Sequence, residues 1–310
     1  MSRQHRVGVI GLGSMGRPMG RNLVLRGHDV WGFDISAAAT TAAAAEGIKP
    51  AAGPAGIAAE CELVLVMVWD DQALRNVVFG AGGLLEAANL PDCVIDLSTT
   101  SVAVAREVGR AMDVRGGTFL DGAIIGGGVA AARAAKSPIV LAGDRAVYDR
   151  YLPVLASLGP CDYVGALGNA KAVKIINNFI VGTVTAANAE ALSLGVAMGL
   201  EVGDLIRWLR QGPGSSRVLE SYMGRYVEEG IYGEGLIGHR LMAKDLQLAA
   251  ELAESVNVPA IYPRFGQQMY LTFGRALGDD RPFPSAFDYF CDVAARKNHG
   301  SQETMRKACE

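Results

Sequence analysis

The chain has 310 residues, half of them hydrophobic, and a formal net charge of −3. This length allows two domains or one large domain, and the apolar content is enough for a sizeable core. A nearly neutral chain without a long run of one charge has no electrostatic reason to bind nucleic acid or a membrane surface, so we expect neither as a partner.

Apolar segments and cysteines indicate the compartment. The N-terminal apolar run is too short for a signal peptide, and we find no later segment of about 20 unbroken apolar residues. We therefore expect a cytoplasmic protein. The five cysteines are widely spaced and form no CxxC pair, which favours reduced thiols over disulfides or a zinc site, and we expect no bound metal.

A glycine-rich turn between a strand and a helix is the first functional motif. A β-rich run over residues 5–10 precedes GLGSMG at residues 11–16, and a helical pattern follows over residues 17–26. The first glycine permits a tight turn, the second lets backbone N–H groups approach a pyrophosphate, and the third allows close helix packing. The residues expected to bind a dinucleotide here are Gly11, Leu12, Gly13, Ser14, Met15 and Gly16.

An acidic residue after the second strand indicates which dinucleotide binds. The strand predicted over residues 29–33 ends before Asp34, about 20 residues beyond the turn, where a carboxylate accepts hydrogen bonds from ribose hydroxyls. This carboxylate would repel a 2′-phosphate, and neither Ile35 nor Ser36 supplies a cation. We therefore expect NAD rather than NADP. A glycine turn that binds nothing is disfavoured, because strand, turn, helix and acid occur in the required order.

Further strands and helices alternate along the first half of the chain. The predicted strands cover residues 63–68, 93–97, 117–120 and 139–141, and the predicted helices cover residues 37–45, 71–79, 101–112 and 145–157. This alternation predicts a Rossmann domain, a doubly wound parallel sheet, over residues 1–164.

Ligands of such a sheet bind beyond the carboxyl ends of its strands. Val68, Trp69 and Thr99 stand at two of these ends, and a glycine-dense loop over residues 121–128 follows a third. Consecutive glycines can expose N–H groups that hold a carboxylate. The alternatives stay open that Thr99 only helps to cap a helix, that Trp69 only packs, and that the glycines only turn the chain.

A long stretch without proline, residues 165–200, predicts one helix of about 45 Å that begins with Asn169 as its N-cap. Along it Lys174, Asn178, Thr185 and Asn188 recur at helical spacing and so place polar groups on one face. These groups would hold a substrate against the cofactor. The alternative is a lysine that extends to solvent and asparagines that bond to neighbouring backbone.

The second half predicts an all-α domain over residues 165–294 that begins with this interdomain helix, followed by a polar tail over residues 295–310. Helices are expected over residues 204–210, 218–228 and 241–253, with breaks at residues 212–216, 230–238, 259–263 and 278–284. The substrate is expected in the cleft between the two domains. Excess apolar surface on the long helix predicts a homodimer or a homotetramer.

Four motifs in order resemble the β-hydroxyacid dehydrogenase family, the family of 3-hydroxyisobutyrate dehydrogenase, up to about residue 290. They are VIGLGSMGRPMGRNL at 9–23, DLSTTS at 96–101, GALGNAKAVKIINN at 165–178 and LMAKDLQLA at 241–249. The resemblance implies that Thr99 contacts the cofactor, that Lys174 rather than Lys171 is the catalytic lysine, that Asn178 is the substrate-side amide, and that Lys244 reaches back to the cofactor.

The substrate loop departs from the family pattern. The family usually has Asp-Ala-Pro-Val-Ser-Gly-Gly, whereas this chain has DGAIIGGG at residues 121–128, without a serine. Carboxylate binding is therefore expected from the amides of Gly126, Gly127 and Gly128 alone. His239, near the fourth motif, is expected to be a surface or capped histidine rather than an acid or base.

The resemblance implies an NAD-dependent oxidoreductase that interconverts a small 3-hydroxy acid and its semialdehyde or keto acid. Lys174 would act as the general base in oxidation and as the acid in reduction, because burial and a positively charged nicotinamide both disfavour its ammonium form. Asn178 would orient the lysine or bind the substrate hydroxyl. Which hydroxy acid is used stays open.

Three alternatives remain. An imine-reductase-like enzyme is disfavoured, since that group resembles this layout with Asp or Tyr at the lysine position and a basic NADP-binding residue after the second strand. A phosphogluconate-dehydrogenase-like enzyme would need phosphate-binding cations that the sequence does not place. A non-catalytic NAD-binding sensor would have no need of Lys174 and Asn178 together.

Overall fold

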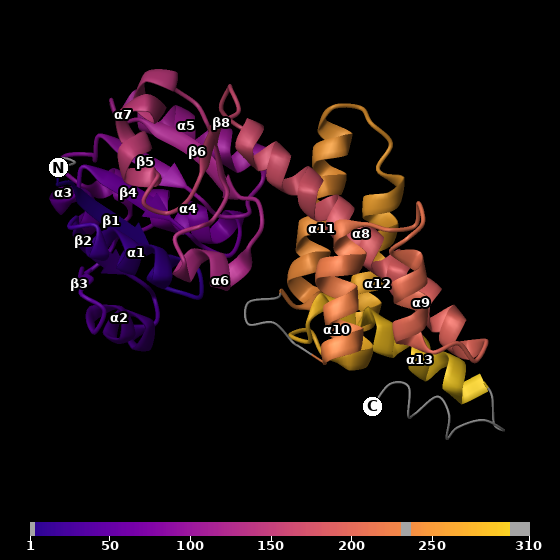
Figure 1. Cartoon of the computed structure of the whole chain (residues 1–310). Helices are drawn as coiled ribbons and strands as arrows, with labels where there is room; N and C mark the ends of the chain where they lie inside the picture. Colours follow the sequence, from indigo (N-terminus) through magenta and orange to yellow (C-terminus); the bar gives the residue numbers. More distant parts are fainter. Residues whose placement is uncertain (1–3, 231–236, 298–310) are drawn as a thin grey trace. The chain divides into compact units, whose positions relative to one another are not determined.

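In the computed structural model, which describes residues 4–230 and 237–297, strands and helices alternate up to residue 163 and only helical segments follow (Figure 1). The chain divides into two units, Met1–Lys174 and Ile175–Glu310. Helix α8, Asn169–Ala197, begins in the first unit and continues in the second. The units therefore divide within the second turn of this helix, whereas the sequence prediction places the boundary just before it.

The described part of the first unit forms an eight-stranded sheet in the order β3-β2-β1-β4-β5-β6-β7-β8. All neighbouring strands are parallel except β6 and β7, which are antiparallel, so the predicted Rossmann fold is confirmed with one exception to its parallel pairing. The strands are β1 Arg6–Ile10, β2 Asp29–Phe33, β3 Lys49–Pro50, β4 Leu63–Val66, β5 Cys93–Asp96, β6 Phe119–Ile124, β7 Ile139–Ala142 and β8 Cys161–Tyr163.

Side chains alternate between the two faces of this sheet, and each face has its own core. Val9 and Leu65 belong to one core, whereas Ile10 and Val66, the next residues along the same strands, belong to the other. Helices cover both faces. They are α1 Gly16–Leu25, α2 Ala37–Ala44, α3 Pro54–Glu60, α4 Asp71–Phe79, α5 Val102–Val114, α6 Gly128–Arg133 and α7 Arg145–Leu155, with a short 3₁₀ turn at Leu84–Glu86.

Several boundaries differ from the sequence predictions. The fifth predicted strand ends at residue 120, but β6 continues to Ile124, so Asp121 lies inside the sheet rather than in the glycine loop. The preceding strands end early, β4 at Val66 and β5 at Asp96. The sequence reading missed β3, β8, α3 and α6, which are too short to show an apolar period.

The regular elements in the described part of the second unit are all helical. After α8 come α9 Val202–Leu209, a π-helical turn Leu219–Met223, α10 Gly224–Glu229, α11 His239–Ser255, α12 Ile261–Leu277, a 3₁₀ turn Phe283–Ser285 and α13 Ala286–Lys297. The predicted break at 259–263 is too long, because Pro263 lies in the first turn of α12, where a missing N–H costs no helical bond. The break at 230–238 and the tail at 295–310 lie largely outside the described residues.

Length and hydropathy alone would allow α8 to cross a membrane, and it is the one helix of which this holds in the described parts of the chain. Its residues Ala186, Ala189 and Leu192 pack into the core of the second unit. A core helix of a soluble protein passes the same test by length and composition. The absence of a membrane partner therefore stays a prediction.

His239, expected to be a surface or capped histidine, is fully buried at the start of α11. Its Nε2 shares a hydrogen bond of 2.8 Å with Ser285 Oγ, and its ring lies 5.9 Å from the ring of Tyr270 and 5.8 Å from that of Phe273. Burial and, to a smaller extent, the charge of Arg281 lower its pKa from the ordinary 6.5 to about 4. The histidine is therefore a neutral core residue at physiological pH.

This burial predicts a pH-dependent stability. A folded-state pKa below the unfolded one means that the unfolded chain binds more protons between pH 6.5 and 4, so the contribution of His239 is complete above pH 6.5 and is lost as pH falls through this window. The loss amounts to about 3 kcal/mol. We expect His239→Gln to unfold in urea with a flatter pH dependence than wild type. Parallel curves for the two proteins between pH 6.5 and 4 would contradict the assignment.

Candidate functional site

The glycine turn after β1 has the geometry that its motif predicts. Gly11 has φ +92°, and its N–H donates to the Phe33 carbonyl at 2.9 Å. A Cβ on Gly11 would lie 2.0 Å from the Met67 carbonyl oxygen, and one on Gly16 would lie 1.8 Å from the Gly11 carbonyl oxygen. A Cβ on Gly13 would meet nothing within 4 Å. Two glycines therefore shape the turn, and the middle one leaves space in front of it.

Asp34 follows β2 and is bonded to this turn. Its Oδ2 accepts from the backbone N–H of Leu12 at 2.7 Å, and its Oδ1 accepts from that of Ser36 at 2.8 Å. Each carboxylate oxygen keeps a second lone pair, so a ribose hydroxyl can still donate to it. The neighbouring Ile35 is 97% exposed. The acid thus connects the second strand to the turn.

The residues after β4 and β5 are fixed by local bonds. The N–H of Val68 donates to Ser98 Oγ at 2.8 Å, which ties the ends of these paired strands together. Asp70 caps helix α4 by accepting from the N–H of Ala73 at 2.8 Å. Trp69, between these two bonds, is 73% exposed, and Thr99 is half-buried. Trp69 therefore does not serve as a core residue of the first unit.

Two lysines of α8 bind carbonyls of β6 that lie beyond the end of its pairing with β5. The parallel pairing of β5 with β6 ends at Asp96 and Asp121, so Gly122 and Ile124 extend beyond it. Lys171 Nζ donates to the Gly122 carbonyl at 2.8 Å, and Lys174 Nζ donates to the Ile124 carbonyl at 2.8 Å. Carbonyls two residues apart point to the same edge of a strand, roughly 7 Å from each other.

Lys171 has a structural environment. Its side chain is fully buried, and its Nζ donates to the carbonyls of Asp96 and Ser98 at 2.8 Å each and lies 2.9 Å from Asp96 Oδ2. Asp96 also accepts from the Ser98 N–H at 3.0 Å and from Thr100 Oγ1 at 3.1 Å. Every ammonium proton of Lys171 therefore has an acceptor within the protein, and none is left for a substrate.

Asp121 provides the cap of α8 that the sequence prediction assigned to Asn169. Its Oδ1 accepts from the N–H of Gly168 at 2.7 Å, and its Oδ2 accepts from the N–H of Lys171 at 3.0 Å. Asn169 is the first helical residue, and its Nδ2 donates to the Val164 carbonyl at 2.8 Å. Burial raises the pKa of Asp121, while these N–H bonds and the Lys171 charge oppose the rise. The sequence offered one sign of this role, because Asp121 is an acidic residue within the otherwise apolar strand β6.

Lys174 and the glycine loop lie at the same end of β6. Lys174 is half-buried, and its acceptor Ile124 is the last residue of the strand. The three glycines that follow have φ of +125° (Gly126), +78° (Gly127) and +55° (Gly128), and the latter two are exposed. The structure therefore brings the predicted catalytic amine next to the predicted carboxylate loop.

The loop is tied to the cofactor helix through α6. Asn22 of α1 is buried, and its Nδ2 donates to the Ala132 carbonyl of α6 at 2.6 Å. Helix α6 begins at Gly128, so this bond fixes the segment that follows the loop. Asn22 belongs to the first sequence motif, where a generic Rossmann turn does not require it.

Asn178 and Lys244 belong to the second unit, where both contact Asp245. Asn178 Nδ2 donates to Asp245 Oδ2 at 2.6 Å, and Lys244 Nζ lies 3.1 Å from Asp245 Oδ1. The amide oxygen of Asn178 accepts from Asn177 Nδ2 at 3.0 Å. The third and fourth sequence motifs therefore meet at a buried carboxylate that the sequence reading did not select. The roles of Asn178 toward a substrate and of Lys244 toward a cofactor stay predictions.

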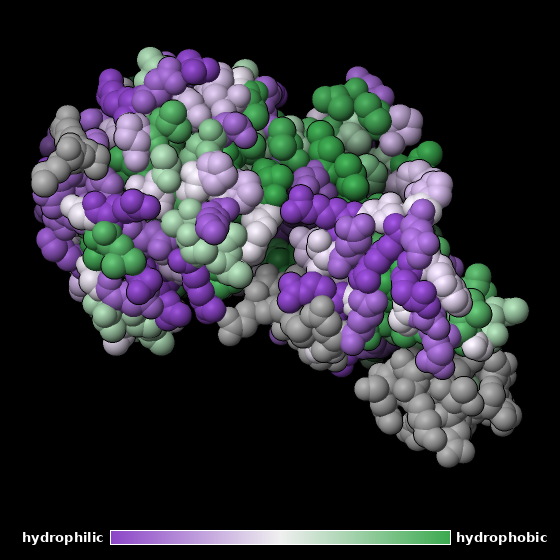
Figure 2. Space-filling model, viewed as in Figure 1, coloured by the Kyte–Doolittle hydropathy of each residue, from purple (hydrophilic) through white to green (hydrophobic). Residues whose placement is uncertain are grey.

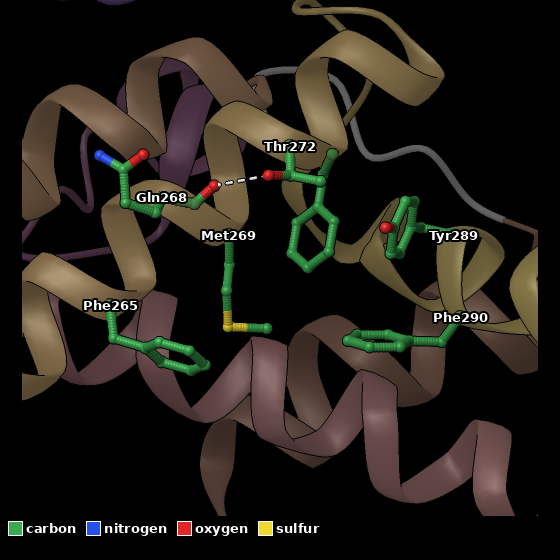
Figure 3. Close-up of a pocket in the computed structure, with 7 residues that line it drawn as sticks. Phe265, Gln268, Met269, Thr272, Tyr289 and Phe290 are labelled. Atoms are coloured by element: carbon green, nitrogen blue, oxygen red, sulfur yellow. Dashed lines mark hydrogen bonds between the residues drawn. The ribbon is translucent and has the colours of Figure 1, made fainter.

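A pocket of about 260 Å³ in the second unit is chemically unsuited to an acid substrate (Figure 3). Its lining is mainly aromatic and apolar and contains no charged residue. The lining residues are Phe265, Gln268, Met269, Thr272 and Phe273 of α12, and Tyr289 and Phe290 of α13. The hydroxyl of Thr272 donates to the Gln268 carbonyl at 2.9 Å, as drawn in the figure.

The described residues contain no group of three or more His, Cys, Asp or Glu side chains that could hold a metal ion. Cys61, Cys93, Cys161 and Cys291 are free thiols, and Cys309 lies outside the described residues. Burial raises the pKa of Cys61 and of Cys161 to about 12, so neither forms a thiolate at neutral pH.

The glycine turn gives a matched pair of predictions. Gly13→Ala should leave the free energy of unfolding unchanged within about 0.5 kcal/mol, because its Cβ meets no protein atom, yet raise the dissociation constant for NADH about tenfold or more by blocking the ligand. Gly11→Ala should cost about 1–3 kcal/mol of stability because of its positive φ. Urea unfolding and NADH fluorescence titration measure both. Tight NADH binding by Gly13→Ala would remove the turn from the cofactor site.

Comparisons with known proteins agree with this arrangement. Residues 6–168 match the NAD binding domain of 6-phosphogluconate dehydrogenase, and residues 168–289 match the family described as NAD-binding of NADP-dependent 3-hydroxyisobutyrate dehydrogenase. The chain is 31% identical over 287 residues to 2-(hydroxymethyl)glutarate dehydrogenase of Eubacterium barkeri, covering 92% of this chain and 94% of that protein.

Solved structures extend the comparison. The structure of Mycobacterium tuberculosis 3-hydroxyisobutyrate dehydrogenase with L-serine has a TM-score of 0.83 and 28% identity, and it covers 93% of this chain and 99% of its own. An imine reductase from Streptomyces aurantiacus, with a TM-score of 0.61 and 23% identity over 92% of this chain and 99% of its own, shares the fold alone. With its glycine turn, its lysine beside the glycine loop and these relatives, the chain belongs to the β-hydroxyacid dehydrogenase family.

Proposed function

We propose that the protein is an NAD-dependent dehydrogenase that interconverts a small 3-hydroxy acid and its semialdehyde or keto acid, with Lys174 as general acid and base. The observation that carries the proposal is the position of the Lys174 amine, bonded to Ile124 at the start of the glycine loop. A half-buried amine beside a row of exposed backbone amides combines a proton carrier with an anion site.

Oxidation of a hydroxyl group needs removal of one hydride and one proton. NAD, when bound, supplies the hydride acceptor. Lys174 in its neutral form takes the hydroxyl proton, and in reduction its ammonium form returns a proton to the forming alkoxide. The bond to Ile124 uses an N–H of the amine as donor, whereas proton abstraction would use the nitrogen lone pair of its neutral form.

The substrate class follows from the loop and from the family. The amides of Gly126, Gly127 and Gly128 would bind the carboxylate, since successive backbone N–H groups in a turn can form an anion site and all three residues have a positive φ. Asn178, held by Asp245, would bind the hydroxyl or the chain of the substrate. The relatives are named for 2-(hydroxymethyl)glutarate and 3-hydroxyisobutyrate, which are both 3-hydroxy acids.

The cofactor site of the first unit would consist of the glycine turn with Asp34 and the strand-end residues Val68, Trp69 and Thr99. The family resemblance adds Lys244 as a further cofactor contact. NAD is preferred over NADP because Asp34 would face the 2′ position and Ile35 and Ser36 carry no positive charge. We infer a cytoplasmic enzyme with no nucleic-acid, membrane or metal partner.

We also infer a homodimer or a homotetramer. Large apolar residues are exposed at the turn from α11 to α12 and on the first turns of α12, where hydrophobic residues gather in Figure 2. Val258 is 54% exposed, Ile261 70%, and Tyr262 and Phe265 64% each. A contiguous apolar patch of this kind favours protein–protein contact.

The rival functions have less support. An NAD-binding sensor would need neither the Lys174 amine nor the glycine loop. A phosphogluconate-dehydrogenase-like enzyme would need cations at the loop, and residues 125–130 contain none. An imine-reductase-like enzyme is disfavoured by Lys174 and Asp34, as argued from the sequence.

Lys174→Ala should abolish most turnover and leave cofactor binding intact. We expect kcat to fall about 10²- to 10⁴-fold because the proton has no carrier, while the dissociation constant for NADH stays within about twofold. Reduction of NAD, measured with 3-hydroxyisobutyrate, 2-(hydroxymethyl)glutarate, glycerate and threonate in turn, provides the assay.

Lys136→Ala, which removes an exposed lysine outside the site, is the matched control and should behave as wild type. Wild-type kcat in Lys174→Ala would show that the amine is misassigned. If the wild-type protein binds NADH but reduces NAD with none of the four acids, the alternative function as a non-catalytic NAD-binding sensor is supported.

Asp34→Ser should change the cofactor preference. Removing the carboxylate removes its repulsion of the 2′-phosphate, so the ratio of kcat/KM for NADP to that for NAD should rise at least about tenfold. Asp29→Ser, an acid on the same β2 strand that pairs with Lys49 at 2.8 Å, should leave the ratio unchanged. A wild-type enzyme that already prefers NADP would refute the role of Asp34.

A further inference from the structure

The buried ion cluster, defined as Asp96, Asp121 and Lys171, takes no part in the proton transfer proposed above. All three side chains are essentially inaccessible to solvent. Their side-chain bonds connect α8, and Gly168 just before it, with the ends of β5 and β6 and with the loop after β5. The cluster therefore connects the helix that carries Lys174 with the strands that end at the proposed site.

We propose that Asp121 and Lys171 are positioning residues for Lys174, which hold the first turn of α8 in the one register that places the Lys174 amine on the Ile124 carbonyl. The inference rests on the proposed function, because it assigns a purpose to the placement of an amine that is taken to be catalytic. It adds to that function the residues that determine the placement.

Two matched spacings support the register. Lys171 and Lys174 are three residues apart, so they lie on neighbouring positions of one helix face. Their acceptors, Gly122 and Ile124, are two residues apart on one edge of β6. A rotation or shift of α8 that breaks the Lys171 bonds therefore moves Lys174 away from Ile124 as well. Since a lysine side chain has four rotatable bonds, its backbone must be fixed to define its amine.

Asp121 fixes the same turn from its end. It accepts from the N–H groups of Gly168 and Lys171, which belong to the amides that a helix leaves unpaired at its N-terminus. Gly168 has φ +101°, so the chain turns sharply into the helix at this point. One carboxylate on the strand thus sets both the start of α8 and its distance from β6.

A lysine suits position 171 for a simple chemical reason. Where β5 ends, the carbonyls of Asp96, Ser98 and Gly122 converge on the Lys171 ammonium at 2.8 Å each. Buried carbonyls require donors. The three protons of one ammonium serve all three, and the Asp96 carboxylate balances the charge.

A cluster that only stabilises the fold would predict a different result from one that positions Lys174. In both cases loss of Lys171 lowers the thermal midpoint. Only in the second case does the folded variant turn over slowly, because a displacement of about 1 Å at a reacting group can cost roughly a hundredfold in rate.

The experiment compares Lys171→Met, Asp121→Ala and Asp121→Asn with Ile57→Ala, a core variant of helix α3 that lowers stability without contact to the cluster. The assay measures NAD reduction with whichever of the four acids named above the wild type oxidises. The assay temperature is kept below the thermal midpoint of every variant. We expect kcat about ten- to a hundredfold lower for Lys171→Met and Asp121→Ala, a smaller loss for Asp121→Asn, which keeps one acceptor, and NADH dissociation constants within about twofold of wild type.

Ile57→Ala should keep wild-type kcat despite its lower midpoint. Wild-type kcat in folded Lys171→Met and Asp121→Ala, with Lys174→Ala inactive, would overturn the positioning role and leave the proposed function standing. Wild-type kcat in Lys174→Ala would instead refute the proposed function itself.

Hydrogen exchange provides a second test that requires no enzymatic activity, and it uses two variants so that the test remains possible if one of them does not fold. Hydrogen exchange of the backbone amides of Gly168 and Lys171 should accelerate at least tenfold in Asp121→Asn and in the charge-neutral double variant Asp96→Asn/Lys171→Met, while the amides of α11 keep their wild-type rates. Unchanged exchange at both amides in these variants would show that the cluster does not hold the first turn of α8.

Discussion

The first unit depends on a mismatch in length between two neighbouring strands. β5 ends at Asp96, while β6 continues past Asp121 to Ile124, so Gly122 and Ile124, which pair with β7, extend beyond β5. Backbone acceptors that are buried without a donor are costly. Helix α8 meets this requirement with two lysine ammonium groups, and in doing so it brings its N-terminal turns to the carboxyl edge of the sheet, where ligands of this fold bind.

Two lysines of one helix face thereby acquire different chemistry. Lys171 is fully buried and paired with Asp96, so its protons are all engaged and its charge is balanced. Lys174 is half-buried and borders the glycine loop. The same side chain is a structural cation in the first environment and a candidate acid and base in the second. The comparison shows why residue type alone does not assign a role, whereas burial and the neighbouring groups do.

In the second unit, too, polar side chains from different segments meet at a buried carboxylate. Asp245 on α11 receives the amide of Asn178 from α8 and lies beside Lys244. Leu246 and Phe273 belong to the core of this unit, and the ring of neutral His239 lies 5.8 Å from that of Phe273. The pocket on α12 and α13 has no charged residue in its lining, which distinguishes it from the candidate site (Figure 3).

The sequence alone determined the features that depend on local signals. The glycine turn, Asp34, the long helix and the Rossmann order follow from spacing and periodicity over a few residues, and the choice of Lys174 over Lys171 follows from the family resemblance. The tertiary structure decided the remainder: Asp121 inside a strand and capping a helix 47 residues away, Lys171 75 residues from Asp96, and His239 in the core. Such contacts join segments that are distant in the sequence. The apolar pattern of one segment does not predict which polar groups of another segment will contact it.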